Sequence, residues 1–166
     1  MVSAVFADTS YFLALSARRD RLHTQAVALQ GWLNQPILTT EWVLTEVADA
    51  LAAPGTRARF AALIERLNAR PDVRIVSVSH EHFEKGCALY LQRMDKGWSL
   101  TDCISFLVMR HRGIQAALTS DQHFAQAGFR ILMSMEPLGV KEPALLYDAD
   151  PIAAPDGVTS EVRDAA

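Results

Sequence analysis

The stretch VFADTSYFLAL, residues 5–15, joins an apolar run to a helical pattern through one acidic residue. Residues 2–7 form a short apolar segment, as expected for a buried strand. After Asp8, Thr9 and Ser10, the apolar residues recur at the spacing of a helix. Ligand sites in open parallel sheets gather at the carboxyl ends of the strands. The stretch therefore predicts a strand–helix unit with a carboxylate at the edge of the sheet where ligands bind.

Four more strand patterns follow, and helical patterns separate them. Connections of helical length imply a mostly parallel sheet with helices on both faces. The sequence therefore predicts an α/β fold. The predicted strands are residues 2–7, 37–40, 73–78, 114–120 and 129–133.

The helical patterns begin at residues that cap helices and end near glycine or proline. The predicted helices are one that follows Ser10, one capped by Asp20 that runs through Trp32 and Leu33, one capped by Thr39 or Thr40 that reaches Leu51, residues 56–69, one capped by Ser79 that reaches Met94, residues 101–111, and a short one that starts at Asp121.

The composition is that of one globular domain, since half of the residues are hydrophobic and 21% are charged. The formal net charge of −3 excludes a globally basic surface, so an RNA site would need a local basic rim. From Pro137 onward, proline and glycine interrupt every pattern. We therefore predict a domain at residues 1–136 and a flexible tail, rich in proline, alanine and aspartate, at residues 137–166.

The chain is predicted to be a cytoplasmic protein without a membrane segment. It does not begin with a signal-peptide pattern, and no run approaches the roughly 20 apolar residues that span a bilayer. Cys87 and Cys103 show neither a metal-like nor a redox-like spacing, and they are expected to be small buried hydrophobic residues. A chain without a disulfide framework fits a reducing compartment.

Four acids fall at strand ends or in the first turns of the helices next to them: Asp8, Glu46, Asp102 and Asp121. Each has a plain structural interpretation, because aspartate caps helices and glutamate commonly lies on a solvated helix face. Glu46, however, lies near a buried stripe, and Asp102 lies in the apolar segment WSLTDCISFLVM. Buried carboxylates that lie close together need protons or a cation. The joint pattern therefore predicts a divalent cation, and oxygen ligands favour Mg²⁺ or Mn²⁺.

Four segments in this order resemble the PIN-domain ribonucleases, in particular the VapC-type toxins of bacterial toxin–antitoxin pairs: VFADTSYFLAL, TTEWVLTEVADAL, WSLTDCISFLVM and ALTSDQHF. The resemblance covers roughly residues 2–135. It implies a three-layer α/β/α fold, with a parallel sheet of about five strands, and an Mg²⁺- or Mn²⁺-dependent endoribonuclease.

The resemblance also implies roles for individual residues. Asp8 and Asp102 would be direct or water-mediated metal ligands. Glu46 and Asp121 would hold metal waters or a second ion, and one of the acids would orient the attacking water. The supporting hydroxyl residues fall on Thr9 or Ser10, on Thr101 and on Thr119.

In VapC-type proteins the partners are an RNA substrate, a homodimer mate and an antitoxin that blocks the active site. The helices at residues 40–69 are predicted to carry an apolar surface for such a partner. Two other functions remain open: a housekeeping PIN-type nuclease for RNA processing and a non-catalytic module that binds RNA or protein. Dinucleotide and ATP binding are disfavoured because neither glycine-rich phosphate motif occurs. The residues that suggest the apolar surface are Trp42, Val43, Leu44, Leu51, Phe60 and Leu63.

A few other residues have two interpretations. His123 is the one histidine near the proposed site, and a surface or capping role is its plain alternative. Trp98 either packs in the core or stacks on a base, whereas Trp32 and Trp42 are predicted to be core residues. Basic residues that would contact RNA phosphates, or simply lie in solvent, are Arg18, Arg19, Arg21, Arg93 and Lys96.

Overall fold

The computed structural model describes residues 4–133 and contains a five-stranded sheet in the order β3-β2-β1-β4-β5. Every neighbouring pair of strands is parallel. The predicted parallel sheet of about five strands is therefore confirmed. The strands are β1 (Val5–Ala7), β2 (Ile37–Thr40), β3 (Val73–Val76), β4 (Ala116–Leu118) and β5 (Arg130–Ile131).

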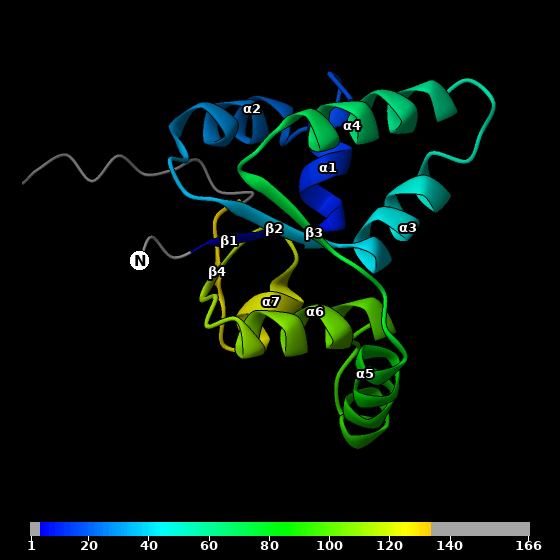
Figure 1. Cartoon of the computed structure of the whole chain (residues 1–166), viewed down its shortest axis with the longest axis vertical. Coiled ribbons are helices and arrows are strands. Elements are labelled where there is room, and N and C mark those ends of the chain that lie inside the picture. The colour runs from blue at the N-terminus through cyan, green and yellow to red at the C-terminus, as the bar shows by residue number, and fades with distance from the viewer. Residues whose placement is uncertain (1–3, 134–166) are drawn as a thin grey trace, which may run out of the picture.

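Helices cover both faces of the sheet, which confirms the three-layer α/β/α arrangement (Figure 1). Helices α1, α2 and α4 lie on one side, and α6 and α7 lie on the other, with α5 packed against α6. Helix α3 contacts α1, α4 and α6. The helices are α1 (Thr9–Ser16), α2 (His23–Trp32), α3 (Glu41–Ala50), α4 (Arg57–Ala69), α5 (His80–Gln92), α6 (Leu100–His111) and α7 (Gln122–Gln126).

Strand β1 lies at the centre of the sheet and carries the first predicted acid at its end. Phe6 pairs with Leu38 of β2 on one side and with Ala117 of β4 on the other. All three residues of β1 are buried, as expected for a strand covered on both faces. On the α6 side, the Phe6 ring meets that of Phe124 at a centroid distance of 6.1 Å. This packing fixes the position of the chain immediately before Asp8.

Several predicted strands are too long at their ends. β3 ends at Val76 instead of residue 78, and β4 covers only the middle of the predicted 114–120. β5 is limited to two residues of the predicted 129–133. After β3 and β4 the chain turns toward a helix, and residues 132 and 133 keep only single backbone hydrogen bonds to Ala117 and Thr119, so composition alone does not mark the strand ends.

Several helices begin at other residues than predicted. Helix α1 begins at Thr9, directly after its cap Asp8, instead of after Ser10. Helix α6 begins at Leu100 and is capped by Ser99, so Thr101 lies inside its first turn. Helix α2 begins at His23, and the side chain of Asp20 instead accepts a hydrogen bond from the backbone N–H of Leu22 at 2.8 Å. An aspartate side chain can accept a hydrogen bond in a turn just before a helix as readily as it can cap the helix.

The tryptophan predictions are partly wrong. Trp98 is a core residue, 4% exposed, with its ring 5.1 Å from that of Phe106. Trp42 is half-buried, and Trp32 is 83% exposed. Helical periodicity identifies an apolar face, but it does not tell which residues of that face are covered by a neighbouring helix or strand. Of the two cysteines, Cys103 is buried as expected, whereas Cys87 is only half-buried.

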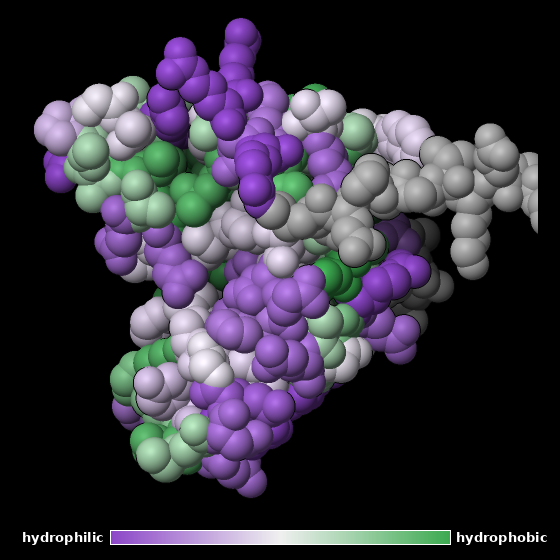
Figure 2. Space-filling view, turned by 180° about the vertical axis from the view of Figure 1, so that it is seen from behind, coloured by the Kyte–Doolittle hydropathy of each residue, from purple (hydrophilic) through white to green (hydrophobic). Residues whose placement is uncertain are grey.

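The apolar surface predicted at residues 40–69 belongs mostly to the core, because Val43, Leu44, Leu51 and Leu63 are buried. Large exposed apolar side chains include Val27 and Trp32 on α2 and a larger group on α5 and just before and after it, where Figure 2 shows hydrophobic residues at the lower left. The residues of this larger group, which we call the α5 surface, are Val78, Phe83, Tyr90, Leu91 and Met94.

Within residues 4–133, no helix is both long enough and apolar enough to cross a membrane. The predicted tail at 137–166, and the boundary before it, lie outside the described residues.

Candidate metal centre

One pocket of about 360 Å³ opens at the carboxyl end of the sheet, and all four predicted acids line it. Asp8 directly follows β1 and Asp121 follows β4. These strands are neighbours, with Ala7 paired to Leu118, so the two acids come to the same edge. Glu46 comes from α3 and Asp102 from the start of α6. The fold thus brings together four acids from four separate segments.

Asp8 is a buried carboxylate, 5% exposed, that also caps α1. Its Oδ2 atom accepts hydrogen bonds from Thr119 Oγ1 at 2.8 Å and from Ser10 Oγ at 3.2 Å. Burial raises the pKa of Asp8 from 3.8 to about 6, and the hydrogen bond from Thr119 opposes this shift. The negative charge of Asp102 raises the pKa of Asp8 further. The ionised form of Asp8 is therefore costly in this environment without a nearby positive charge.

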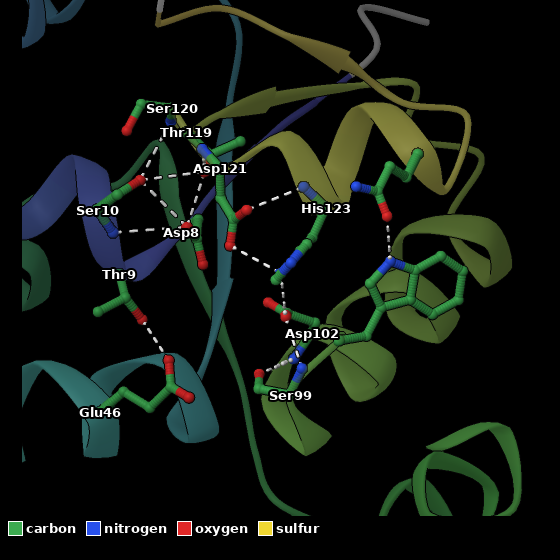
Figure 3. A network of polar contacts seen from close by, with 12 residues as sticks. Asp8, Thr9, Ser10, Glu46, Ser99, Asp102, Thr119, Ser120, Asp121 and His123 are labelled. Atoms are coloured by element: carbon green, nitrogen blue, oxygen red, sulfur yellow. Dashed lines mark hydrogen bonds and ion pairs between the residues drawn. The ribbon is translucent and has the colours of Figure 1, made fainter. Parts of the chain in front are cut away.

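Thr119 connects the ends of β1 and β4. Its hydroxyl donates to Asp8 and accepts from the backbone N–H of Asp121 at 3.0 Å. Ser10 closes the network, because its hydroxyl lies 3.0 Å from that of Thr119 and accepts from the backbone N–H of Ser120 at 3.2 Å. Figure 3 shows this group of hydroxyl and carboxylate side chains around Asp8.

Asp102 is 7% exposed and is fixed by a capping box at the start of α6. Its Oδ2 atom accepts from the backbone N–H of Ser99 at 2.8 Å, and its own backbone N–H donates to Ser99 Oγ at 2.9 Å. Burial raises the pKa of Asp102, the backbone hydrogen bond from Ser99 opposes this, and the charge of Asp121 raises the pKa again. Asp102 is thus a second carboxylate held where its charge is unfavourable.

His123 lies between two of the acids (Figure 3). Its Nδ1 atom is 3.2 Å from Oδ2 of Asp102 and 3.3 Å from Oδ2 of Asp121. Asp121 also caps α7 by accepting the backbone N–H of His123 at 2.9 Å. Asp102, Asp121 and His123 each offer a ligand atom, and these atoms lie within 4.8 Å of one another.

Glu46 faces the pocket from α3. Its Oε2 atom accepts a hydrogen bond of 2.8 Å from Thr9 Oγ1. Thr9 lies in the first turn of α1, one residue after Asp8, so it connects the glutamate to the end of β1. The side chain of Thr40 caps α3 by accepting the backbone N–H of Val43, which sets the position of Glu46 within the helix.

The structure separates the predicted supporting residues into two groups. Thr9, Ser10 and Thr119 contact an acid directly, whereas Thr101 is not among the residues that line the pocket. Ser99 supports Asp102 in its place. The spacing S-x-x-D at residues 99–102 is the sequence signal of a capping box that would have identified Ser99. For the double contact of His123, the sequence gives only its proximity to Asp121.

Two basic residues lie close in the chain to a glycine that lines the pocket, but neither lines it. Gly97 lines the pocket, and Lys96 and Trp98 flank this glycine in the chain. The guanidinium of Arg93 lies over the Trp98 ring, 4.8 Å from its centroid, and it pairs with Asp95 at 2.8 Å. Lys96 pairs with Asp95 at 3.8 Å.

The carboxylate oxygens and the imidazole nitrogen that face the pocket fit a divalent cation. Two of the carboxylates are buried with raised pKa values, and neither lysine nor arginine is among the lining residues. Carboxylate oxygens suit Mg²⁺ and Mn²⁺, and an added imidazole also suits later first-row metals. The compact ligand group of Asp102, Asp121 and His123 differs from the predicted direct pair of Asp8 and Asp102.

Comparison with known proteins identifies the family. The family model described as "PIN domain" matches residues 5–130. The "23S rRNA-specific endonuclease VapC20" of Mycobacterium tuberculosis, strains CDC 1551 / Oshkosh and ATCC 25618 / H37Rv, is 34% identical over 128 residues. The match covers 75% of this chain and 95% of the relative.

Solved structures agree with this assignment. The crystal structure of M. tuberculosis VapC20, described as a sarcin–ricin-loop-cleaving toxin, matches with a TM-score of 0.69 and 28% identity. It covers 75% of this chain and 95% of that one. FitAcB from Neisseria gonorrhoeae shares the fold, with a TM-score of 0.56, 16% identity and coverage of 76% and 95%. VapBC2 from Rickettsia felis, bound to a promoter DNA fragment, has a TM-score of 0.55, 11% identity and coverage of 77% and 96%. The sheet order, the acidic pocket and these matches together place the chain in the PIN domain family, as the sequence motifs predicted.

Proposed function

We propose that the protein is a divalent-metal-dependent endoribonuclease and the toxin of a toxin–antitoxin pair. The observation that carries this proposal is the convergence of four carboxylates on one pocket, two of them buried. Helix capping alone does not explain why two carboxylates are buried at one pocket, since the charge of Asp102 raises the pKa of Asp8 and that of Asp121 raises the pKa of Asp102. The relationship to an endonuclease supports the same function.

In this proposal Asp8 and Asp102 hold Mg²⁺ or Mn²⁺, with Asp121 and Glu46 nearby. When bound, such an ion supplies positive charge to the scissile phosphate and lowers the pKa of water. Both hydroxyl hydrogen bonds to Asp8 fall on Oδ2, so they orient the carboxylate, and no hydroxyl within residues 4–133 bonds to Oδ1. The capping box restrains Asp102 in the same way.

Glu46 is the acid best suited to orient the attacking water. It is less buried than Asp8 and Asp102, and Thr9 holds only its Oε2 atom. The water oxygen forms a new bond to phosphorus, and its proton passes to a carboxylate oxygen. The bond from phosphorus to the leaving ribose oxygen breaks, and that oxygen keeps the electron pair and takes a proton from solvent water. Thr9 acts on this step by restraining the glutamate side chain.

The proposed substrate class is structured ribosomal RNA in the cytoplasm. The support is the 34% identity to a relative named as specific for 23S rRNA, which extends over nearly the whole of that relative. Arg93 and Lys96, beside the pocket, carry charges that suit phosphate contacts.

The test is cleavage of 23S rRNA, a sarcin–ricin-loop hairpin and a scrambled hairpin by the purified full chain. Reactions contain Mg²⁺, Mn²⁺ or EDTA. We expect cleavage of the first two substrates in both metals and none in EDTA, because the acids need a cation to approach a phosphate. Cleavage that continues in EDTA would contradict metal dependence. An intact RNA in every reaction would favour a binding module.

The proposed binding site of the antitoxin is a groove of about 530 Å³ between α1, α2 and α4. Its floor is apolar and includes Tyr11 and Leu67, and the Tyr11 hydroxyl is buried without a hydrogen-bond partner in the described chain. No acid is among the lining residues. An amphipathic segment with glutamate or aspartate beside its apolar face matches this charge. The arginines at the groove are Arg18, Arg59, Arg66 and Arg70.

We expect a synthetic helical peptide, with leucine on one face and glutamate beside it, to bind this groove. A matched peptide with lysine for glutamate should bind at least about tenfold more weakly, because it meets the arginines with like charge. Exchanging Arg59 and Arg66 for glutamate should reverse the preference, and calorimetry measures each affinity. Equal affinities for the two peptides would rule out recognition by charge at this groove.

The proposed interface of the homodimer is the α5 surface. A two-fold contact pairs a surface with itself, and the charges beside this one have both signs, with Glu81–Lys85 and His80–Glu84 pairs along α5. Replacing Leu91 and Met94 by glutamate should convert a dimer to a monomer in light scattering. A monomer in the unchanged protein would contradict the dimer.

A further inference from the structure

The imidazole of His123 is held in a defined position between two carboxylates. The hydrogen bond from its backbone N–H to Asp121 Oδ1, at 2.9 Å, fixes the start of α7 and turns the side chain back over the carboxylate that follows β4. On the other side, Asp102 is anchored through Ser99 at the start of α6. Both carboxylates are therefore held by backbone N–H groups, in addition to their contacts with the imidazole that they share.

The distances around Nδ1 match those between ligands of one metal ion. Two ligand atoms about 2.1 Å from a common ion are about 3.0 Å apart at a right angle and about 3.4 Å apart at a tetrahedral angle. Nδ1 of His123 lies 3.2 Å from Asp102 Oδ2 and 3.3 Å from Asp121 Oδ2. The two separations from Nδ1 are therefore those expected in a ligand set, and all three atoms lie within 4.8 Å of one another.

The surroundings leave room for an ion at this side of the pocket. His123 and both of these acids line the pocket, together with Gly97. A Cβ atom added at Gly97 would lie 3.7 Å from Nε2 of His123, an ordinary van der Waals distance, so the 97–99 loop passes close beside the ring. The ring is thus bordered on one side by backbone and on the other by two carboxylates.

We infer that His123 is a nitrogen ligand of the metal centre, so that the site prefers later first-row ions such as Co²⁺ to Mg²⁺. This inference rests on the proposed metal-dependent function and adds a ligand to it. Mg²⁺ strongly prefers oxygen ligands, whereas an imidazole increases affinity along the first-row series. A site with carboxylates and one imidazole should therefore discriminate between the two ions more strongly than one with carboxylates alone.

The first experiment measures metal affinity without RNA. The full chain is freed of metal with EDTA, dialysed, and titrated with Mg²⁺ and with Co²⁺ by calorimetry. We expect the ratio of the Mg²⁺ to the Co²⁺ dissociation constant to fall at least about tenfold in His123→Gln, because glutamine offers an oxygen in place of the nitrogen. The matched control is His111→Gln, since His111 is exposed at the opposite end of α6 from Asp102.

The second experiment does not depend on the folding of a variant. Pulsed electron paramagnetic resonance of the Mn²⁺-loaded, unsubstituted protein should detect the ¹⁴N coupling of a coordinated imidazole. The coupling should be absent in His123→Gln and present in His111→Gln. Mn²⁺ bound without ¹⁴N coupling would overturn the inference. So would a loss of Mg²⁺ and Co²⁺ affinity by the same factor in His123→Gln, which would make His123 a positioning residue for the two carboxylates.

These results distinguish the inference from the proposed function. RNA cleavage by a metal centre without a nitrogen ligand would overturn only the role of His123. A nitrogen-ligated metal in a protein that leaves every RNA intact would overturn the nuclease and support the ligand. Failure to bind any divalent ion would overturn both.

Discussion

Asp8→Asn and Asp102→Asn should each lower RNA cleavage by at least about a hundredfold. Loss of a group that only supports a metal ligand costs about ten- to a hundredfold, and removal of a buried ligand should cost more. Asparagine keeps the shape and can still accept the hydrogen bonds that Asp8 receives from Thr119 and that Asp102 receives from Ser99. The fold should therefore survive while the charge that holds the cation is lost. Initial rates on the hairpin substrate in Mn²⁺ measure the effect.

The control for both variants is Asp49→Asn, which makes the same chemical change at an exposed position on α3. It should cleave at the rate of the unchanged protein. Circular dichroism and thermal unfolding establish that each variant is folded. A folded Asp8→Asn protein with full activity would show that the pocket is not the catalytic site.

The same substitution, Asp8→Asn, should make the metal-free protein more stable at neutral pH. Burial raises the pKa of Asp8 from 3.8 to about 6, so the folded state binds the proton more tightly than the unfolded chain does. The stability contributed by the protonated carboxyl is complete below pH 3.8 and is lost as the pH rises through about 6. A shift of about two pKa units corresponds to about 3 kcal/mol, which is the upper limit of the gain at pH 7.5.

Urea unfolding in EDTA at pH 5.0 and pH 7.5 measures this effect. The free energy of unfolding should fall between these pH values in the unchanged protein by more than it does in Asp8→Asn. The raised pKa of Asp102 acts in the same direction and remains in that variant, so some pH dependence should persist. Mn²⁺ should stabilise the unchanged protein at pH 7.5, since a ligand bound only to the folded state adds to its stability. Identical pH profiles for the two proteins would contradict the raised pKa of Asp8.

Together, the two predictions describe one trade-off at Asp8. The fold places a carboxylate where its charge is unfavourable, and the proposed function requires that charge. A residue with only a capping role would change neither property, because asparagine caps a helix about as well as aspartate does. Measuring both properties in the same variant therefore separates the metal-binding role from the capping role.

Much of the fold is readable from local signals. The apolar run before Asp8, the caps at Thr40 and Ser79, and the β-branched residues of β3 act over a few neighbouring residues, and the structure contains the elements that they predict. The parallel arrangement follows because helices connect the strands. The strand ends and the start of α6 were less accurate, since the point where a chain leaves a sheet depends on its neighbours in space.

The burial of individual side chains was predicted least accurately from the sequence. Trp32 and Trp42 share the helical apolar pattern with residues that are fully buried, yet one is largely exposed and the other half-buried. The apolar residues at 40–69 were expected to face a partner, and most of them pack in the core instead. One sequence cannot tell an apolar face that meets its own sheet from one that meets another protein, because both have the same periodicity.

The sequence by itself determined which segments carry the acids, because a strand pattern followed by an acidic residue can be recognised from consecutive residues. Parallel topology then implied that Asp8, Glu46, Asp102 and Asp121 would meet at one edge, and they line one pocket. Only the tertiary structure decided how they meet: Thr119 bonded to Asp8 across neighbouring strands, and His123 between Asp102 and Asp121. The physical reason is that hydrogen bonds and metal ligation act over about 2–4 Å, and side chains distant in sequence reach such distances only after the helices and strands have packed.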